Sequence, residues 1–138
     1  MLISSKGRYA LRVMLELAEH SREEFIPLKE ITERQNISQK YLESIMVMLS
    51  KSGFVVAMHG KGGGYKLSKE PKEYKIGDIL RLTEGTLAPV MCLEENAPRC
   101  ERANQCKTLP LWTGLNNAIT GYLDGVTLED VLRGSDKL

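Results

Sequence analysis

Apolar residues recur at helical intervals near the start of the chain, between residues 6 and 20. The repeating apolar positions are Ala10, Leu11, Met14, Leu15, Leu17 and Ala18. This spacing predicts an amphipathic helix that keeps Glu16 and Glu19 on its solvent side. The segment EEFIP should end the helix. Pro27 then suits the first position of a short second helix that reaches about Gln35, because that position needs no backbone N–H donor.

A third helix is predicted after the tight connection QNIS. Ser38 is a favourable N-cap, because its hydroxyl can accept a backbone N–H of the first turn. The helix should run to about Ser52, and Gly53 stands where a left-handed C-cap residue belongs. Its apolar positions are Leu42, Ile45 and Leu49. Its polar positions on another face are Gln39, Lys40 and Glu43. Packing against a core does not require this second face.

Two short strands joined by a glycine-rich turn come next. Residues 54–58 (FVVAM) are apolar and β-branched, and residues 65–68 (YKLS) alternate, so both are predicted strands. The turn between them reads HGKGGGY, which gives a β-hairpin with a basic tip at His59, Gly60 and Lys61. A purely structural hairpin should need one glycine rather than four. We therefore expect the extra glycines to let the backbone approach another surface.

The second half of the chain is predicted to hold a short helix, a loop and a long helix. The short helix is marked by Ile76, Ile79, Leu80 and Leu82. Residues 85–107 show no periodicity and read as a loop. The long helix starts at Thr108 and Pro110, ends at Gly125, and carries the stripe Leu111, Leu115, Ala118, Ile119 and Tyr122. Thr127 and Asp130 then have capping-box spacing for a last helical turn that closes at Gly134.

The order helix, helix, tight turn, helix, hairpin is typical of a winged helix-turn-helix. The predicted fold class is therefore mostly α with a small β-hairpin wing. Residues 1–82 form the DNA-binding part, with a recognition helix at about 38–52 and a wing at about 54–68. Residues 83–138 hold the loop and the long helix, and both parts are expected to make a single compact domain.

In such modules the helix after the turn enters the major groove of DNA. A glutamine can then read adenine, a glutamate can accept from cytosine, and a lysine can hold phosphate or guanine. These roles suit Gln39, Glu43 and Lys40, while Ser38 and the free N–H groups of the first turn favour a phosphate. The plain alternative is a solvated helix face. A nucleotide-binding glycine loop is disfavoured, because strands flank the glycines and no helix follows them.

Charge changes this picture only slightly. The chain of 138 residues has a net charge of +1, but residues 1–82 hold 14 Lys and Arg against 10 Asp and Glu. Residues 83–138 hold 5 against 8, so a basic half adjoins an acidic half. No apolar run reaches the length of a membrane span, and the first residues lack a signal-peptide core. The expected location is the cytoplasm.

All three cysteines fall between residues 92 and 106. Disulfides are disfavoured in the cytoplasm, so this grouping favours metal binding or redox sensing. Three thiolates are too few for a closed structural zinc site, and an iron–sulfur cluster also normally takes four ligands. A fourth ligand can come from Glu94, Glu95, Glu101, a partner subunit or a small thiol. Zinc, a thiol-based redox switch and inert thiols remain alternatives.

Catalysis is not expected. The two histidines, His20 and His59, are far in sequence from the cysteines, so no nucleophile–base pair is visible. A dimeric interaction protein without DNA binding is a third class. It would not need both a recognition helix and a wing.

Several segments resemble the family of bacterial regulators that includes the iron–sulfur cluster regulator IscR, the nitric-oxide sensor NsrR and the cysteine-metabolism regulator CymR. They are ISSKGRYALRVMLELA, PLKEITERQNISQKYLESIMVMLSKSGFV, GKGGGYKLSKEP and LWTGLNNAITGYLDGVTLEDVL. The resemblance implies a transcriptional regulator, a repressor, that reads a roughly palindromic operator as a homodimer. The long helix, at about 109–124, would cross its partner.

The resemblance also implies roles for individual residues. DNA contacts fall on Ser38, Tyr41 and Glu43, and the ligands of an iron–sulfur cluster fall on Cys92, Cys100 and Cys106. A 2Fe–2S cluster is favoured over a 4Fe–4S cluster. The regulator would then sense iron–sulfur, redox or nitric-oxide status. The alternative is a cluster-free regulator that acts through thiols or in cysteine metabolism.

The sequence departs from the family pattern at two positions. Many members carry an arginine just before the wing glycines, and that arginine enters the minor groove. Here the position is His59, which is shorter and mostly neutral near pH 7, so the contact should weaken or pass to Lys61. The cysteine spacing also differs, and Leu109 stands where IscR has a histidine ligand. The family's histidine ligand is therefore missing.

Overall fold

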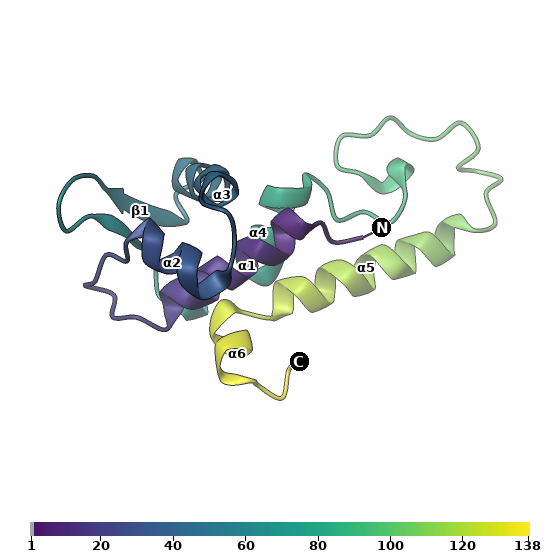
Figure 1. Ribbon diagram of the computed structural model, residues 1–138. Helices are drawn as coiled ribbons and strands as arrows, with labels where there is room; N and C mark the ends of the chain where they lie inside the picture. The colour runs from purple at the N-terminus through teal and green to yellow at the C-terminus, as the bar shows by residue number, and fades with distance from the viewer. Residues whose placement is uncertain (1) are drawn as a thin grey trace.

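The computed structural model describes residues 2–138, which form mostly helix with one two-stranded antiparallel sheet (Figure 1). The elements are α1 (Ser5–Ala18), α2 (Leu28–Gln35), α3 (Gln39–Lys51), β1 (Val55–Met58), β2 (Gly64–Leu67), α4 (Ile76–Glu84), α5 (Leu109–Gly125) and α6 (Leu128–Arg133). Two short 3-10 turns cover Pro71–Glu73 and Met91–Leu93. The predicted elements are all present, with boundaries shifted by at most two residues.

Local capping explains why the helices start and stop where they do. The Ser38 hydroxyl accepts the N–H of Tyr41 at 3.3 Å, so the predicted N-cap of α3 is confirmed. Gly53 follows the end of α3 with φ +76°, a left-handed conformation that suits glycine. At α6, Thr127 and Asp130 form the predicted capping box, with bonds of 3.1 and 2.9 Å. Pro27 is the N-cap of α2 rather than its first helical residue.

Helix α1 lies at the centre of the molecule, with the other helices of the N-terminal part around it (Figure 1). It contacts α2, α4, α6 and β2, while α3 packs on α2 and β1. The fully buried large side chains come from five helices and from the α1–α2 connection. They are Val13, Met14, Ile26, Ile31, Leu42, Ile45, Met46, Leu49, Ile79 and Leu128. One continuous apolar core therefore holds α3 by the face that the sequence pattern assigned to it.

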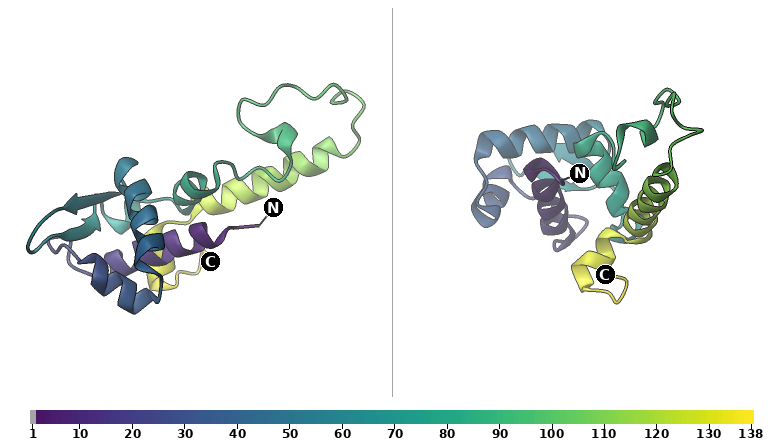
Figure 2. Two further views of the ribbon diagram at one scale, coloured as in Figure 1. Left: turned by 45° about the horizontal axis from the view of Figure 1, so that its top comes forward. Right: turned by 90° about the vertical axis from the view of Figure 1, so that its right-hand side faces the viewer.

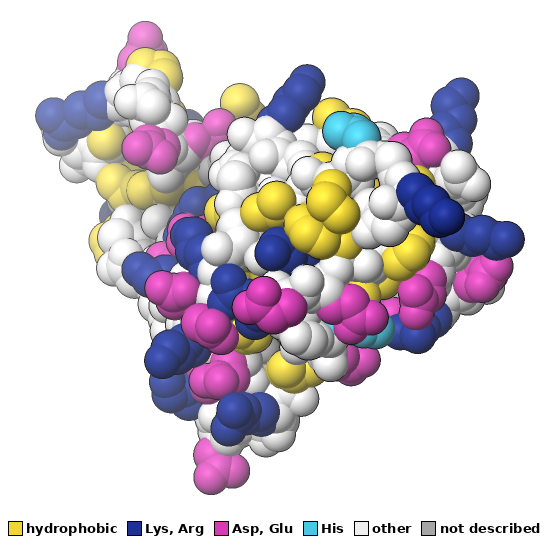
Figure 3. All heavy atoms as spheres, turned by 90° about the vertical axis from the view of Figure 1, so that its left-hand side faces the viewer, with side chains coloured by type: hydrophobic (Ala, Val, Ile, Leu, Met, Phe, Trp, Pro, Cys, Tyr) yellow, Lys and Arg dark blue, Asp and Glu magenta, His cyan; other side chains and the backbone are white. Residues whose placement is uncertain are grey.

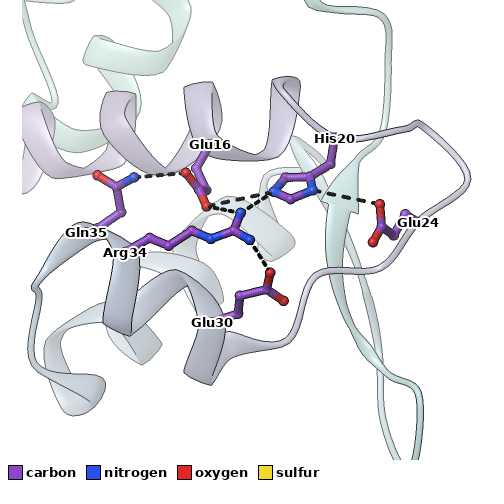
Figure 4. A network of polar contacts seen from close by, with 6 residues as sticks. All are labelled: Glu16, His20, Glu24, Glu30, Arg34 and Gln35. Atoms are coloured by element: carbon purple, nitrogen blue, oxygen red, sulfur yellow. Dashed lines mark hydrogen bonds and ion pairs between the residues drawn. The ribbon is translucent and has the colours of Figure 1, made fainter.

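Glu16 was expected on the solvent side of α1, and this prediction is wrong. Its side chain is only 6% exposed and meets α2, where Arg34 Nη1 donates to Oε1 at 3.0 Å and Gln35 Nε2 donates to Oε2 at 3.1 Å (Figure 4). Arg34 also pairs with Glu30 and contacts His20 Nε2 at 2.9 Å. A carboxylate can be buried when charged donors satisfy its oxygens. Glu19, in contrast, is exposed as expected.

The wing is a hairpin in which β1 and β2 pair from Val55 opposite Leu67 to Met58 opposite Gly64. Main-chain bonds of 2.8 and 2.9 Å also join Tyr65 to Ile26 of the α1–α2 connection. A side chain at Gly64 would place its Cβ 2.2 Å from the carbonyl oxygen of Ile26, and one at Gly63 would lie 2.1 Å from that of Met58. Both contacts are far too short for any residue but glycine.

The remaining two wing glycines, Gly60 and Gly62, have φ values of +90° and +78°. Such values favour glycine whatever surrounds the tip. The expectation that a hairpin would need only one of these four glycines is therefore wrong. Their number follows from the wing itself and carries no information about a partner surface.

The molecule is elongated, with the wing at one end and the cysteine-containing loop at the other (Figures 1 and 2). Helix α5 runs from this loop back towards α4 and α6. Its Leu111, Leu115 and Tyr122 are 61%, 42% and 50% exposed. Within residues 2–138 no helix is long and apolar enough to cross a bilayer.

Candidate nucleic-acid interface and cysteine loop

The polar face of α3 points into solvent, as predicted. Gln39, Lys40 and Glu43 are all exposed, while the opposite face holds the fully buried Leu42, Ile45, Met46 and Leu49. Gln39 Nε2 donates to Glu43 Oε1 at 3.1 Å, which is the i to i+4 spacing of neighbours on one helix face. The glutamine thus orients the carboxylate before any ligand arrives.

Ser38 and Tyr41 have larger structural roles than the other residues predicted to contact DNA. The Ser38 hydroxyl accepts a main-chain N–H, so only its own O–H remains to donate to a ligand. Tyr41 is half-buried, and its ring meets that of Tyr9 edge-on with centroids 5.7 Å apart. The Arg12 guanidinium carbon lies 5.1 Å from the centre of the Tyr9 ring and is exposed. Tyr41 therefore fixes the start of α3 on α1.

The wing tip carries His59, Gly60 and Lys61, all exposed. Figure 3 shows the end of the molecule that bears the wing. Lys and Arg side chains project from its upper and right-hand edges, and acidic side chains gather in its lower half. A histidine also lies at the upper edge, and apolar side chains occupy the middle of this face. The upper and right-hand edges of this end therefore offer cationic groups, while its lower half carries both signs of charge.

Sequence reasoning did not single out the apolar side chains on this part of the surface. Val47 of α3 is 50% exposed, and Val56 and Met58 of β1 are 41% and 43% exposed. A signal was available for Val47, because it follows Glu43 by four residues and so shares its helix face. Val56 and Met58 alternate with the buried Val55 along β1.

The cysteine loop, residues 85–107, places two of the three cysteines at one surface hollow. Cys92 and Cys100 are exposed and line a hollow of about 520 Å³ with Met91, Glu94, Arg99 and Glu101. Cys106 does not line this hollow; it stands just before α5, with Sγ 3.3 Å from Thr108 Oγ1. Within residues 2–138 no three His, Cys, Asp or Glu side chains are placed to hold a metal ion. A three-cysteine site would thus require the loop to rearrange.

The thiol of Cys106 has hydrogen-bond partners at the start of α5. Hydrogen bonding with the Thr108 hydroxyl and backbone lowers the pKa of Cys106, and Arg102 adds a smaller effect in the same direction. A thiolate is the form that binds soft metals and attacks disulfides. The donor set of the loop therefore fits an iron–sulfur group in chemical type, although not in the arrangement seen here.

A polar link joins the start of α1 to the start of the cysteine loop. Glu84, the last residue of α4, accepts the Ser4 N–H at 2.6 Å and the Ser4 hydroxyl at 2.8 Å. Ser4 is the N-cap of α1, and its hydroxyl accepts the Gly7 N–H at 3.1 Å. Glu84 also lines a hollow of about 430 Å³ with Glu94 of the loop and Asn116 of α5. Glu84 therefore contacts the N-cap of α1 and also borders a hollow lined by the loop.

The known proteins similar to this chain include regulators named IscR and regulators named CymR. The profile of the Rrf2 family, described as an iron-dependent transcriptional regulator, matches residues 3–134. The HTH-type transcriptional regulator IscR of Serratia proteamaculans is 37% identical over 138 residues, all of this chain and 83% of that protein. The IscR of Pectobacterium atrosepticum is 36% identical over the same shares.

The solved structures include both IscR and CymR. CymR, the global cysteine regulator of B. subtilis, is 38% identical with a TM-score of 0.79, over 99% of each chain. IscR of T. potens is 34% identical with a TM-score of 0.73, over 97% of this chain and 88% of that one. The oxidized form of Staphylococcus aureus CymR is 34% identical, with a TM-score of 0.72. The predicted fold class and the predicted resemblance are confirmed.

Proposed function

Because the chain belongs to the Rrf2 family of transcriptional regulators, we propose that it binds a double-stranded DNA operator as a homodimer and responds to the state of its cysteine loop. Membership makes it a helix-turn-helix regulator and not an enzyme. The observation that carries the operator proposal is the exposed polar face of α3. The same chain also exposes a basic wing tip.

In this proposal α3 enters the major groove by its N-terminal end. Glu43 accepts from a cytosine amino group, and Gln39 both orients Glu43 and reads adenine. Lys40 holds phosphate or guanine, and the first turn at Ser38 holds a phosphate by its free N–H groups. Tyr41 sets the start of the helix through its contact with Tyr9. His59, Gly60 and Lys61 carry the wing tip to the neighbouring backbone or minor groove.

The homodimer is proposed to form along α5. Leu111, Leu115 and Tyr122 leave much of their apolar surface in water, which a second copy of the helix would cover. A two-fold axis then relates the two copies of α3. Two half-sites of opposite direction follow from that symmetry, so the operator should be roughly palindromic.

We propose Cys92, Cys100 and Cys106 as the ligands of an iron–sulfur cluster. When bound, such a group supplies a centre whose stability and redox state depend on iron supply, oxygen and nitric oxide. Residues 85–107 would order around it, and Glu84 would carry the change to the Ser4 cap of α1. DNA affinity would then depend on the loop because its two arrangements place α1, and with it α3, differently.

A cluster-free thiol switch is the second candidate, and one observation favours it. The cysteines are free, two are exposed, and no group of three ligands is formed among residues 2–138. The lowered pKa of Cys106 favours its thiolate, which is the reactive form. A two-electron oxidant such as a peroxide would take two electrons and two protons from a pair of these thiols, join them in a disulfide and so reshape the same loop.

One set of measurements separates the iron–sulfur cluster from the thiol switch. The protein would be purified without oxygen, and its visible absorption, iron and acid-labile sulfide would be measured beside Cys92→Ala, Cys100→Ala and Cys106→Ala. Arg99→Ala, in the same loop, is the matched control. Fluorescence anisotropy against genomic DNA fragments would follow at several salt concentrations, since phosphate contacts make affinity fall with salt.

A coloured wild type with iron and sulfide supports the cluster, provided that the cysteine variants lose the colour and Arg99→Ala keeps it. A protein that stays colourless after reconstitution rejects the cluster. If its DNA affinity still changes on mild oxidation, the thiol switch stands. A protein that shows no preference for any fragment in either state rejects operator binding itself.

A further inference from the structure

From the exposed face of α3 we infer that Val47 is a specificity-determining residue that recognises a thymine through its 5-methyl group. The inference rests on the proposed operator binding and names a base contact beyond those made by Gln39, Lys40 and Glu43. It starts from an apolar side chain that is half exposed on the solvent-facing surface of α3.

The position of Val47 on the helix is the first argument. It follows Glu43 by four residues and Gln39 by eight, so the three side chains form one row along the exposed face. The opposite face of the same helix is completely buried, which fixes the direction in which this row points. A helix that presents Gln39 and Glu43 to base edges must therefore present Val47 as well.

The exposure of Val47 is the second argument. Half of its side chain is in water, whereas Ile45 and Met46 beside it are fully buried. A β-branched residue also lowers helix propensity relative to Lys, Gln or Glu, which are the residues that solvent-facing positions usually take. Scattered exposed apolar residues are common. This one lies in line with two side chains that have base-reading chemistry.

The chemistry of the neighbouring side chains is the third argument. Ser44, also on the exposed side, donates its hydroxyl proton to the Tyr41 carbonyl at 2.7 Å, so it has no proton left for a base. Lys51 lies beyond Val47 at the end of the helix and suits a phosphate, while Ser52 donates its hydroxyl proton to the Met48 carbonyl at 2.6 Å. Ser44 can still accept from a base amino group. Val47 is the exposed apolar side chain past Glu43 on this face, and an isopropyl group can only read an apolar feature. In the major groove that feature is the thymine methyl.

The rise of the helix limits where this thymine can lie. Val47 stands one turn beyond Glu43, or roughly 6 Å at about 1.5 Å per residue. Base pairs are stacked about 3.4 Å apart along each strand. The thymine should therefore lie within about two base pairs of the position that Glu43 reads.

The test starts from a random double-stranded DNA library, from which the wild-type protein selects its preferred site. Each thymine in that site is then replaced in turn by deoxyuridine, which removes the methyl group and keeps every hydrogen-bonding atom. Affinities are measured for the wild type, Val47→Ala and Glu43→Ala. Val56→Ala is the matched control, since Val56 is an exposed valine on β1 instead of α3, at 41% against 50% for Val47.

We expect one deoxyuridine, within about two base pairs of the position relaxed by Glu43→Ala, to weaken wild-type binding roughly fourfold, the effect of one buried methyl group. Val47→Ala should bind the thymine and uracil sites equally well, and Val56→Ala should keep the wild-type penalty. A methyl penalty that persists in Val47→Ala, or no sensitive thymine in that window, overturns the inference. If the library yields no preferred site at all, the proposed operator binding fails instead.

Discussion

Arg81 of α4 and Asp124 of α5 form a two-point ion pair, with Nη1 2.9 Å from Oδ1 and Nη2 2.8 Å from Oδ2. It connects the helix that ends at the cysteine loop with the helix proposed to join two protomers. Gly77 makes the approach possible, since a Cβ at that position would lie 2.0 Å from Asp124 Oδ1. The relative position of α4 and α5 is therefore set by a charged contact as well as by apolar packing.

Asp124→Asn should reduce stability at neutral pH by about 1 kcal/mol, because both partners are about a third exposed and water screens the pair. Hydrogen bonds from Arg81 hold the pKa of Asp124 below its usual value. The stabilisation is therefore complete above the unfolded pKa of about 3.9 and disappears as the pH falls through the lower folded value. The wild type and the variant should converge in acid.

Urea unfolding between pH 2 and pH 7 at one protein concentration would measure this effect. Asp136→Asn is the matched control, because it removes the same charge from an exposed position near the C-terminus. A constant difference between Asp124→Asn and the wild type across this range would contradict the ion-pair explanation.

Glu16→Ala should destabilise the protein by about 1.5–3 kcal/mol, because it removes charged hydrogen bonds from Arg34 and Gln35 inside the α1–α2 interface. Glu19→Ala, three residues later on the exposed side, should change stability little. The midpoints of urea unfolding would compare the two. Equal effects would mean that the buried network contributes no more than a surface charge.

Glu43→Ala should relax discrimination at one base pair by about 1–3 kcal/mol, while affinity for unrelated DNA holds or rises because a repulsion towards phosphates is lost. Gln39→Ala should produce a weaker loss at the same base pair, since Gln39 orients the carboxylate. Competition binding with every single-base variant of the selected site would show this. If Glu43→Ala weakened binding equally on all DNA sequences, Glu43 would act only as a surface charge.

Lys61→Ala should weaken binding to every DNA sequence and lower the slope of log affinity against log salt by about one, as expected for one lost phosphate contact. Lys72→Ala, in the short turn that packs on α6, should leave the slope unchanged. Anisotropy titrations at several salt concentrations would give both slopes. An unchanged slope for Lys61→Ala would place the wing tip away from the DNA.

The sequence predicted best the features that depend on nearby residues. The Ser38 cap, the Gly53 terminus and the Thr127–Asp130 box are decided within a few residues, so their signals can be read directly. The polar face of α3 could be predicted for the same reason, because periodicity separates it from the buried face.

Features that depend on distant partners were missed. Glu16 looked like a solvent residue because Arg34 and Gln35 lie 18 and 19 positions further along the chain. The need for Gly64 comes from the main chain of Ile26, on a different segment. The placement of the cysteines could not be predicted, because the loop lacks periodicity and its main-chain bonds span only three or four residues. Spacing alone does not say which thiols meet.

The main-chain ladder between Tyr65 and Ile26 has a consequence for how this regulator can change over generations. The base of the wing is held by these main-chain bonds, by the Tyr74 hydroxyl, which bonds to the Phe54 carbonyl and the Ser68 N–H, and by the buried Val55 and Leu67. None of these contacts involves residues 59 and 61, so both can mutate without altering where the tip is held. The tip can therefore change one substitution at a time, while the scaffold beneath it stays under separate selection.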